Sequence, residues 1–143
     1  MKKLMFLALA IGVVAVACQS SASENKAAQP KPGELTTIQW VDTLKEMGQV
    51  TEGQVIDISY RFKNAGTKPL VIEQVNVSCG CTVAEKPEKP IAPGEEGIIK
   101  ASFNSTGKPG PNSKSIYVVA NTEGSKEHRL QFMVDVKPAA EKK

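Results

Sequence analysis

Apolar and polar residues alternate along several segments of the chain, and this pattern predicts β-strands. The clearest case is "VIDISYRF" at 55–62, and "IIKASF" at 98–103 and "HRLQFMVDV" at 128–136 repeat it. A period of two places the apolar side chains on one face of a half-buried strand. The positions expected to face inward are Ile56, Ile58, Tyr60, Phe62, Ile99, Ala101, Phe103, Leu130, Phe132, Val134 and Val136. After about residue 35, no segment of ten or more residues keeps a helical period, so we expect an all-β fold.

The segment "LVIEQVNVSCGCTV" at 70–83 contains two alternating sets that are out of step with each other. Leu70 and Ile72 form the first set. The second set consists of Val75, Val77, Cys79, Cys81 and Val83. Because the register changes near Glu73 and Gln74, the pattern predicts a bulge or a strand break there.

Glycine and proline mark the connections between the predicted strands. The sequences "NAG" at 64–66 and "PGE" at 93–95 are typical of turns, and we expect Gly66 to adopt a positive φ. Three prolines make 86–97 a loop, and "NSTGKPGPNSK" at 104–114 reads as a long turn. The segment "VDTLKEMGQV" at 41–50 is interrupted by Gly48, which suggests a strand end followed by a loop.

Six or seven short strands within about 100 residues indicate an immunoglobulin-like antiparallel β-sandwich of about seven strands, in one domain at 35–137. A small barrel is the alternative. Trp40 precedes Cys79 and Cys81, and these two cysteines are too close in sequence to bridge two sheets. The predicted sandwich therefore depends on packing for its stability, without the inter-sheet disulfide of antibody domains.

The N-terminus carries an export pattern. Lys2 and Lys3 precede an apolar run at 4–17 that ends in small residues before Cys18, as in a secretory signal peptide. The run is shorter than the roughly 20 residues of a transmembrane helix. The sequence "VAVAC" at 14–18 resembles a bacterial lipobox, whose cysteine is diacylated after cleavage. We therefore expect a lipoprotein signal peptide at 1–17 and a membrane anchor through a lipid on Cys18. Ordinary cleavage that leaves a free cysteine is the alternative.

Composition changes after Cys18. Residues 18–34 are rich in Ser, Ala, Pro and Lys and lack apolar periodicity, which predicts a flexible tether that spans about 50 Å when extended. The tail at 138–143 is also polar. Removal of residues 1–17 takes two lysines and lowers the formal charge from +3 to +1. With no basic cluster, we expect no nucleic-acid partner. No acidic cluster follows Cys18, which favours a periplasm-facing position in the cell envelope over surface display.

Several short motifs together resemble a known bacterial family. They are Trp40, Gly53, "FKNAG" at 62–66, "PL" at 69–70, "SCGCT" at 78–82, "PGE" at 93–95 and "FN" at 103–104. This series resembles the family called domain of unknown function 1573, which is common among lipoproteins of the Bacteroidetes. The resemblance covers about 40–136 and implies an immunoglobulin-like sandwich related to pilus chaperones. It implies no molecular function, and a fold alone does not supply one.

Cys79 and Cys81 are the residues of greatest chemical interest. In an exported chain, paired thiols tend toward a disulfide, and with Cys18 lipidated these two have only each other. Residues two apart in an extended strand lie about 6.6 Å apart, near the limit for bridged Cα atoms, and Gly80 could supply a bend. Three interpretations remain open: an inward-facing pair that is packed or disulfide-bonded, a thiol-redox pair, and a copper(I) site of two thiolates.

The sequence contains no recognisable catalytic set, so we expect a protein that is not an enzyme. His128 is the only histidine, which leaves too few ligands for a closed zinc site, and its neighbours suggest a solvated position. We expect no cofactor. Asp42-Thr43-Leu44 resembles a short O-glycosylation acceptor in which Thr43 would carry the glycan. The leading hypothesis is a lipid-anchored sandwich that presents end loops or a strand edge to an envelope protein. The alternative is thiol-redox or copper(I) handling at Cys79 and Cys81.

Overall fold

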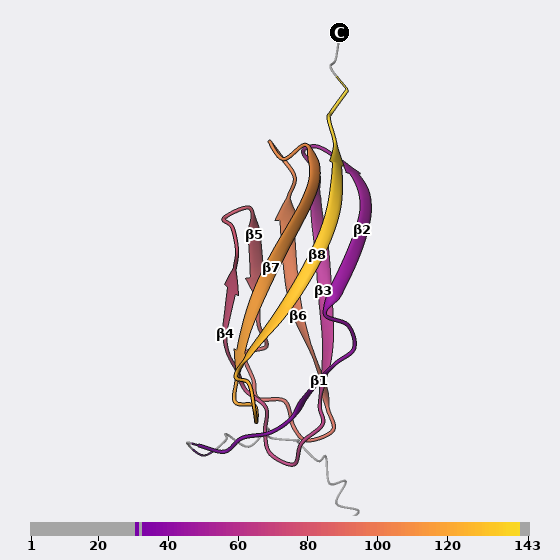
Figure 1. The fold of residues 1–143 in the computed structure, drawn as a ribbon. Helices are drawn as coiled ribbons and strands as arrows, with labels where there is room; N and C mark the ends of the chain where they lie inside the picture. Colours follow the sequence, from indigo (N-terminus) through magenta and orange to yellow (C-terminus); the bar gives the residue numbers. More distant parts are fainter. Residues whose placement is uncertain (1–30, 32, 141–143) are drawn as a thin grey trace, which may run out of the picture.

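The computed structural model describes residues 31 and 33–140, and within these residues it contains eight β-strands and no helix (Figure 1). The predicted signal peptide and Cys18 lie outside the described residues. The strands are β1 (Ile38–Trp40), β2 (Leu44–Thr51), β3 (Val55–Asn64), β4 (Ile72–Val77), β5 (Thr82–Glu85), β6 (Glu96–Asn104), β7 (Gly110–Ala120) and β8 (Glu127–Lys137).

The strands form two four-stranded sheets, in the orders β1-β3-β6-β5 and β2-β8-β7-β4, which confirms the predicted sandwich. The first strand of the sandwich is split between the sheets. β1 pairs antiparallel with β3, and after residues 41–43 the chain crosses over so that β2 pairs with β8. This split explains why eight strands appear where about seven were expected. The β2–β8 pair is parallel, unlike every other pair of strands in the described chain.

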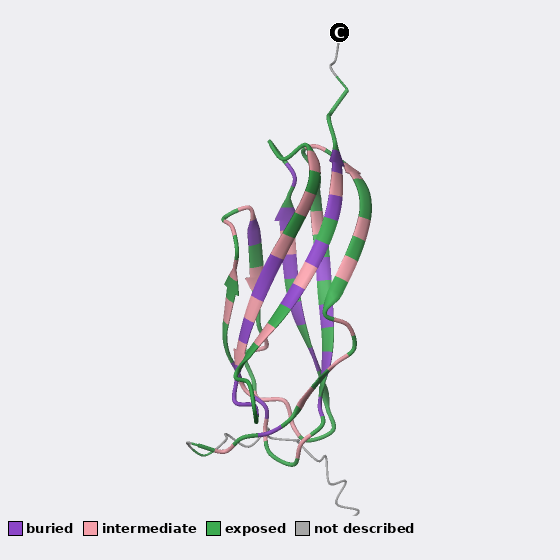
Figure 2. Ribbon diagram, viewed as in Figure 1, coloured by how far each residue is buried: buried purple, intermediate pink, exposed green. Residues whose placement is uncertain are grey.

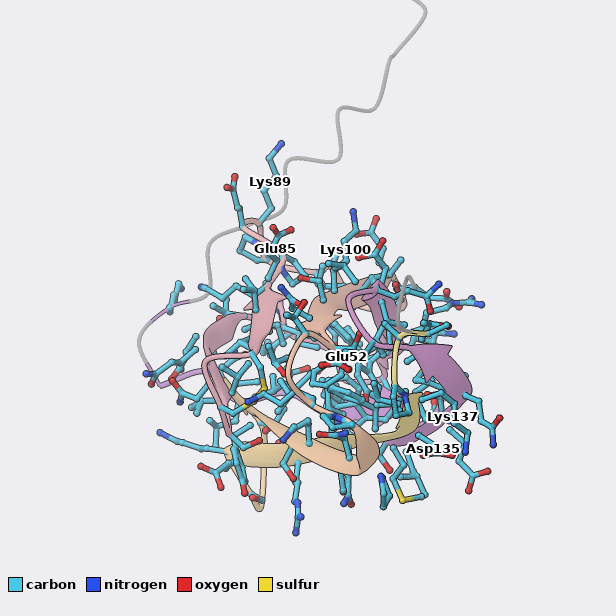
Figure 3. All side chains as sticks on the ribbon, turned by 90° about the horizontal axis from the view of Figure 1, so that it is seen from above. Glu52, Glu85, Lys89, Lys100, Asp135 and Lys137 are labelled. Carbon is cyan, nitrogen blue, oxygen red and sulfur yellow. A yellow bond between two sulfur atoms is a disulfide. The ribbon has the colours of Figure 1, made fainter. Side chains whose placement is uncertain are left out.

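The predicted inward positions of β3, β6 and β8 are confirmed (Figure 2). Ile56 is half-buried, and the others are at most 5% exposed. Phe103 and Phe132 contact each other across the two sheets with ring centroids 5.6 Å apart. Seen along the strands, the charged groups of Glu85 and Lys100 on one sheet and of Asp135 and Lys137 on the other point away from this core (Figure 3).

Two predicted loops are strands in the structure. The segment 44–51, expected to be largely loop, is β2, because its backbone pairs with β8 and a register shift at Gly48 (φ 68°) absorbs the irregularity. Residues 110–114, expected to be part of a turn, begin β7. Pro111 is tolerated there because its nitrogen faces the side on which β4 is absent, since β4 pairs only with 116–120.

The register change near Glu73 and Gln74 is confirmed, since the β4–β7 pairing shifts between Ile72 and Gln74. The second alternating set, however, does not form one strand. β4 ends at Val77, residues 78–81 cross to the other sheet, and β5 begins at Thr82. The crossing resets which face points inward, so Val83 is 61% exposed although it was grouped with inward-facing residues.

The connections gather at two poles (Figure 1). The lower pole contains residues 65–71, 86–95 and 121–126, and β1 starts beside it. The upper pole contains residues 52–54, 78–81 and 105–109, and β8 ends there. The described chain therefore enters the sandwich beside the lower pole, and its last strand ends at the upper pole.

Gly66 does not adopt the expected positive φ, whereas Gly94 does, at 82°. Its role is close approach: a Cβ at position 66 would lie 2.1 Å from Thr36 Oγ1 and 2.6 Å from Thr37 N. The buried Thr36 donates a hydrogen bond to Asn64 Oδ1 (2.9 Å), and Ala65 N donates to Thr37 O (2.9 Å). The "NAG" motif therefore fixes the segment that leads into β1 against the lower pole.

Candidate functional site

Cys79 and Cys81 lie in the connection between β4 and β5 and form a disulfide. Their Cα atoms are 5.4 Å apart, closer than the spacing expected for an extended strand, because the chain turns between the two sheets at this point. Both residues are half-buried, while Gly80 is exposed at the tip of the turn. The pair therefore lies at a sheet-to-sheet crossing and not within a strand.

Hydrogen bonds connect this turn to both sheets. Ser78 N donates to Ser115 O (3.0 Å), and Ser78 Oγ accepts from Ser115 N (3.1 Å). On the other sheet, Asn104 N donates to Cys81 O (3.0 Å). Thr82, which is 3% exposed, lies within hydrogen-bonding distance of Cys79 Sγ, 3.7 Å from its Oγ1. The disulfide thus lies in a corner of the sandwich that is hydrogen-bonded to both sheets.

The surroundings of the disulfide do not support the thiol-redox or copper(I) alternative. The S–S bond engages both sulfur atoms, whereas a copper(I) site would need two free thiolates. Lys86, the nearest cation in the sequence, donates to Ile72 O at 2.8 Å. Among the described residues there is also no helix whose N-terminus could lower a thiol pKa.

The β4–β5 side of the sandwich is linked at both ends. The disulfide turn joins the two strands at the upper pole, and the Lys86–Ile72 hydrogen bond joins their lower ends. Next to it, Leu70 and Ile91 exchange two backbone hydrogen bonds of 2.9 and 2.8 Å. We call this side, formed by β4, β5 and their connections, the closed side.

The opposite side, where β1 crosses over to β2, leaves part of β3 without a neighbour. β3 pairs with β6 from Val55 to Lys63, but with β1 only from Phe62 to Asn64. The last bond on this side is Val41 N to Arg61 O (3.0 Å), so the odd-numbered residues of β3 direct their backbone groups toward β1. The N–H and C=O groups of Val55, Asp57 and Ser59 therefore face an edge with no paired strand. We call this stretch the open edge.

The other sheet edges carry features that oppose pairing with a further strand. β2 has the irregularity at Gly48, and β4 has the register shift between Ile72 and Gln74. β5 is only four residues long. The open edge is regular over its length, and Val55, at its upper end, is 62% exposed. It is the sheet edge best suited to pairing with an extended segment.

A cluster of polar side chains lies at the lower end of the open edge. Lys45 Nζ is 2.9 Å from Asp42 Oδ2 and 6.0 Å from the centroid of the Tyr60 ring. Burial raises the pKa of the Tyr60 hydroxyl, and the charge of Asp42 adds to this shift. Three buried atoms here have no hydrogen-bond partner among the described residues: Trp40 Nε1, Asp42 Oδ1 and Tyr60 Oη. Such atoms are uncommon in folded proteins and call for a specific explanation.

His128 adjoins this cluster and is not the solvated residue that the sequence suggested. Its ring centroid lies 6.0 Å from that of Trp40, and its Nε2 is 2.8 Å from Thr122 Oγ1. Partial burial lowers the pKa of the imidazole. Because Trp40 belongs to one sheet and His128 to the other, the contact joins the two sheets beside the crossover.

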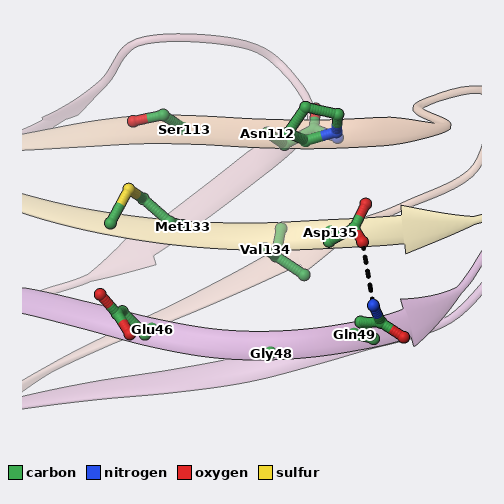
Figure 4. Close-up of a pocket in the computed structure, with 9 residues that line it drawn as sticks. Glu46, Gly48, Gln49, Asn112, Ser113, Met133, Val134 and Asp135 are labelled. Atoms are coloured by element: carbon green, nitrogen blue, oxygen red, sulfur yellow. Dashed lines mark hydrogen bonds between the residues drawn. The ribbon is translucent and has the colours of Figure 1, made fainter.

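A hollow of about 390 Å³ lies on the outer face of β2, β7 and β8 (Figure 4). It lies above Gly48, and Met133 and Pro111 contribute its apolar walls. Two of its polar side chains are joined, since Gln49 Nε2 donates to Asp135 Oδ2 (3.3 Å), which also pairs with Lys137 (2.9 Å). The hollow is an open surface feature in which the carboxylate of Asp135 is already paired.

Within the part of the chain that the structure describes, no three His, Cys, Asp or Glu residues are grouped so that they could hold a metal ion. The same residues include no helix long and apolar enough to cross a membrane. Cys18, the predicted lipid attachment point, precedes the first described residue, and Thr43 is exposed at the crossover between β1 and β2.

Residues 38–136 match the family described as "Protein of unknown function (DUF1573)". The chain belongs to this family. This confirms the resemblance seen in the sequence, and the match spans all eight strands except the last residue of β8. No curated protein matches the chain.

Solved structures with a similar fold are distant in sequence. A protein of unknown function from Porphyromonas gingivalis W83 is 15% identical, with a TM-score of 0.63 over 73% of this chain and 49% of that one. The ASH / PapD-like domain of human CEP192 is 12% identical, with a TM-score of 0.56 over 95% and 100% of the two chains. The YadV chaperone is 18% identical, with a TM-score of 0.51 over 74% and 54%. This chain thus spans about half of the P. gingivalis protein, and these similarities establish the fold alone.

The sequence did not reveal the open edge or the cluster beside it. Tyr60 occupies an inward position of a regular alternation, so its pattern is that of an ordinary core residue. Asp42 and Trp40 lie in a segment whose change of sheet leaves no mark in the hydrophobic pattern. In the sequence, Trp40 stands out as a motif of the family resemblance and by its position before the two cysteines, and neither observation places it beside Tyr60.

Proposed function

We propose that this protein is a non-enzymatic, lipid-anchored module of the cell envelope that binds an extended segment of a partner protein at the open edge. The observation that carries the proposal is the incomplete pairing of β3, whose upper half has a neighbour on one side only. Unpaired strand edges bind extended peptides through backbone hydrogen bonds. Binding through backbone hydrogen bonds does not require a strongly charged surface, which agrees with the near-neutral charge of the mature chain.

The arrangement of the chain supports an anchored role. The described chain begins beside the lower pole, whereas Val55, Asp57 and Ser59 lie in the upper half of β3 (Figure 1). A lipid on Cys18 and a tether at 18–34 would therefore hold the lower pole toward the membrane. The open edge would then face away from the lipid surface, where a periplasmic partner could reach it.

Site-specific photocrosslinking of the full-length protein in cells tests the binding edge. A photoreactive amino acid replaces Val55 at the open edge or, as a matched control, Val83 on the outer strand at the other edge of the same sheet. The two valines are 62% and 61% exposed, so accessibility alone does not separate them. We expect a discrete protein adduct at position 55 and none at position 83. Equal labelling at both positions, or at neither, contradicts the proposal.

A proline scan adds a direct test of strand pairing. Asp57→Pro removes a backbone N–H that faces the open edge and leaves the β3–β6 hydrogen bonds in place, so the adduct at position 55 should disappear. Ala84→Pro, whose nitrogen faces the free side of β5, is the control and should leave the adduct unchanged.

The anchor is tested separately by metabolic labelling with a palmitate analogue. Wild-type protein should be labelled and should sediment with membranes, and Cys18→Ser should abolish both. Retention of the label in the Cys18→Ser protein would contradict lipidation at this residue.

A further inference from the structure

The polar cluster at the lower end of the open edge indicates which side chain the bound segment carries. Asp42 and Tyr60 are brought together by Lys45, which pairs with one carboxylate oxygen of Asp42 and lies over the Tyr60 ring. The other carboxylate oxygen, Asp42 Oδ1, and the Tyr60 hydroxyl are buried and have no partner among the residues described. Tyr60 is 0% exposed.

These two atoms have complementary requirements. Asp42 Oδ1 can only accept a hydrogen bond while the carboxylate is ionised, and the Tyr60 hydroxyl can donate one. A buried polar group without a partner is destabilising by about 1–3 kcal/mol, so a ligand that supplies both partners gains an advantage over an apolar one. A primary amide carries an N–H donor and a C=O acceptor on the same group and can satisfy both atoms.

The position of the cluster places it at the end of the bound segment's path. If β1 continued along β3, Asp42 would be opposite Tyr60, but the chain leaves the sheet after Val41. The next inward position along the open edge is opposite Ile58 and is the neighbour of Tyr60 on the same face. The remaining inward position is opposite Ile56, where half-buried Met47, Val50 and Ile56 border the core and favour an apolar side chain.

We propose that the open edge selects a segment with an asparagine or glutamine at the inward position beside Tyr60 and Asp42, and with an aliphatic residue at the next inward position. This inference rests on the proposed function, because it specifies the ligand of the same edge. The amide donates to Asp42 Oδ1 and accepts from the Tyr60 hydroxyl. The aliphatic side chain packs against Met47, Val50 and Ile56.

A peptide series tests the selectivity. The probes are the capped heptapeptide KVKVKVK and three variants with asparagine in place of the first, second or third valine, so that each inward register is sampled. Trp40 is the only tryptophan of the chain and lies in the cluster, so its fluorescence reports binding to the full-length protein, with calorimetry as the second measurement. We expect one asparagine variant to bind about tenfold more tightly than the all-valine peptide.

Protein variants separate the possible outcomes. Tyr60→Phe should reduce the preference for asparagine to less than about threefold, and Tyr117→Phe, the matched control on β7, should keep it. The inferred selectivity is wrong if the peptides bind, Asp57→Pro abolishes their binding, and no asparagine variant is preferred. It is also wrong if the preference for asparagine survives in Tyr60→Phe. In both cases the binding edge itself is still supported. If no peptide shows binding that Asp57→Pro abolishes, both the edge and its selectivity are contradicted.

Discussion

The two lateral sides of the sandwich differ in how the edges of the two sheets are connected. On the closed side, residues 78–81 connect β4 to β5, and the disulfide, the Lys86–Ile72 hydrogen bond and the Leu70–Ile91 bridge link the two ends of this corner. On the other side, the chain divides its first strand between both sheets and leaves half of β3 with a neighbour only on its β6 side, beside buried polar atoms without a partner among the described residues. The disulfide and these links lie on one side, and the unmet hydrogen-bonding capacity lies on the other. Functional surfaces are commonly drawn from the less stable parts of a fold.

The largest expected effect comes from a leucine-to-alanine substitution made on each of the two sides. Leu70→Ala on the closed side empties a fully buried position and should lower the free energy of unfolding by about 2–5 kcal/mol. Leu44→Ala at the crossover to β2 alters a side chain that is 48% exposed and should change it by less than about 1 kcal/mol. Urea denaturation of both variants measures the difference. Comparable losses would show that the two sides contribute equally.

The second test opens the disulfide corner. Replacing both Cys79 and Cys81 with serine should lower the free energy of unfolding by at most about 1.6 kcal/mol, because closure of a three-residue loop removes little entropy from the unfolded chain. The same variant should retain the adduct at the open edge, since the two features lie on opposite sides. Denaturation with and without reductant provides the measurement. A Cys79→Ser, Cys81→Ser protein that fails to fold would assign the disulfide a much larger role.

The third test concerns the unpartnered hydroxyl. Tyr60→Phe removes a buried polar group without changing the shape of the ring, so it should raise the free energy of unfolding by about 1 kcal/mol. Tyr117→Phe, at a half-buried position on β7, should have a smaller effect. A clear loss of stability in Tyr60→Phe would show that the hydroxyl makes a favourable interaction in the unliganded protein.

The smallest expected effect is a pH dependence of the free energy of unfolding that comes from His128, which lies beside the crossover from β1 to β2. Partial burial lowers the pKa of His128 in the folded state, whereas the unfolded chain has a value of about 6.5. Between these two values the unfolded state binds more protons, so the contribution of His128 is fully present above about pH 6.5 and is lost as the pH falls through the folded pKa. Denaturation from pH 7.5 to 5 should show a steeper loss for the wild type than for His128→Gln. Parallel curves for the two proteins would rule this contribution out.

Much of the sandwich could be predicted from local patterns. The alternation in β3, β6 and β8 identified the core because each strand packs one face against the opposite sheet, and that requirement is visible at every second residue. The shift near Gln74 was visible for the same reason. β2 could not be predicted in this way, because an edge strand with a bulge at Gly48 shows little alternation.

The sites were less accessible from the sequence than the fold. The adjacency of Cys79 and Cys81 is a property of the chain itself, so the pair could be named at once, but its place at a sheet-to-sheet corner depends on where β4 ends. Gly66 was assigned the wrong role for a similar reason, because the segment it must admit, Thr36–Thr37, is distant in sequence.

The sequence by itself determined the sandwich, the inward faces of its main strands and the family to which the chain belongs, because these depend on periodicity and on motifs of a few consecutive residues. Only the tertiary structure decided that the chain leaves the first sheet after Val41, and hence that β3 has an open edge and that Asp42 Oδ1 and the Tyr60 hydroxyl are buried without a partner among the described residues. The physical reason is that an unpaired edge is a missing neighbour. A missing neighbour is defined by the arrangement of strands in space and leaves no pattern in the residues that lack it.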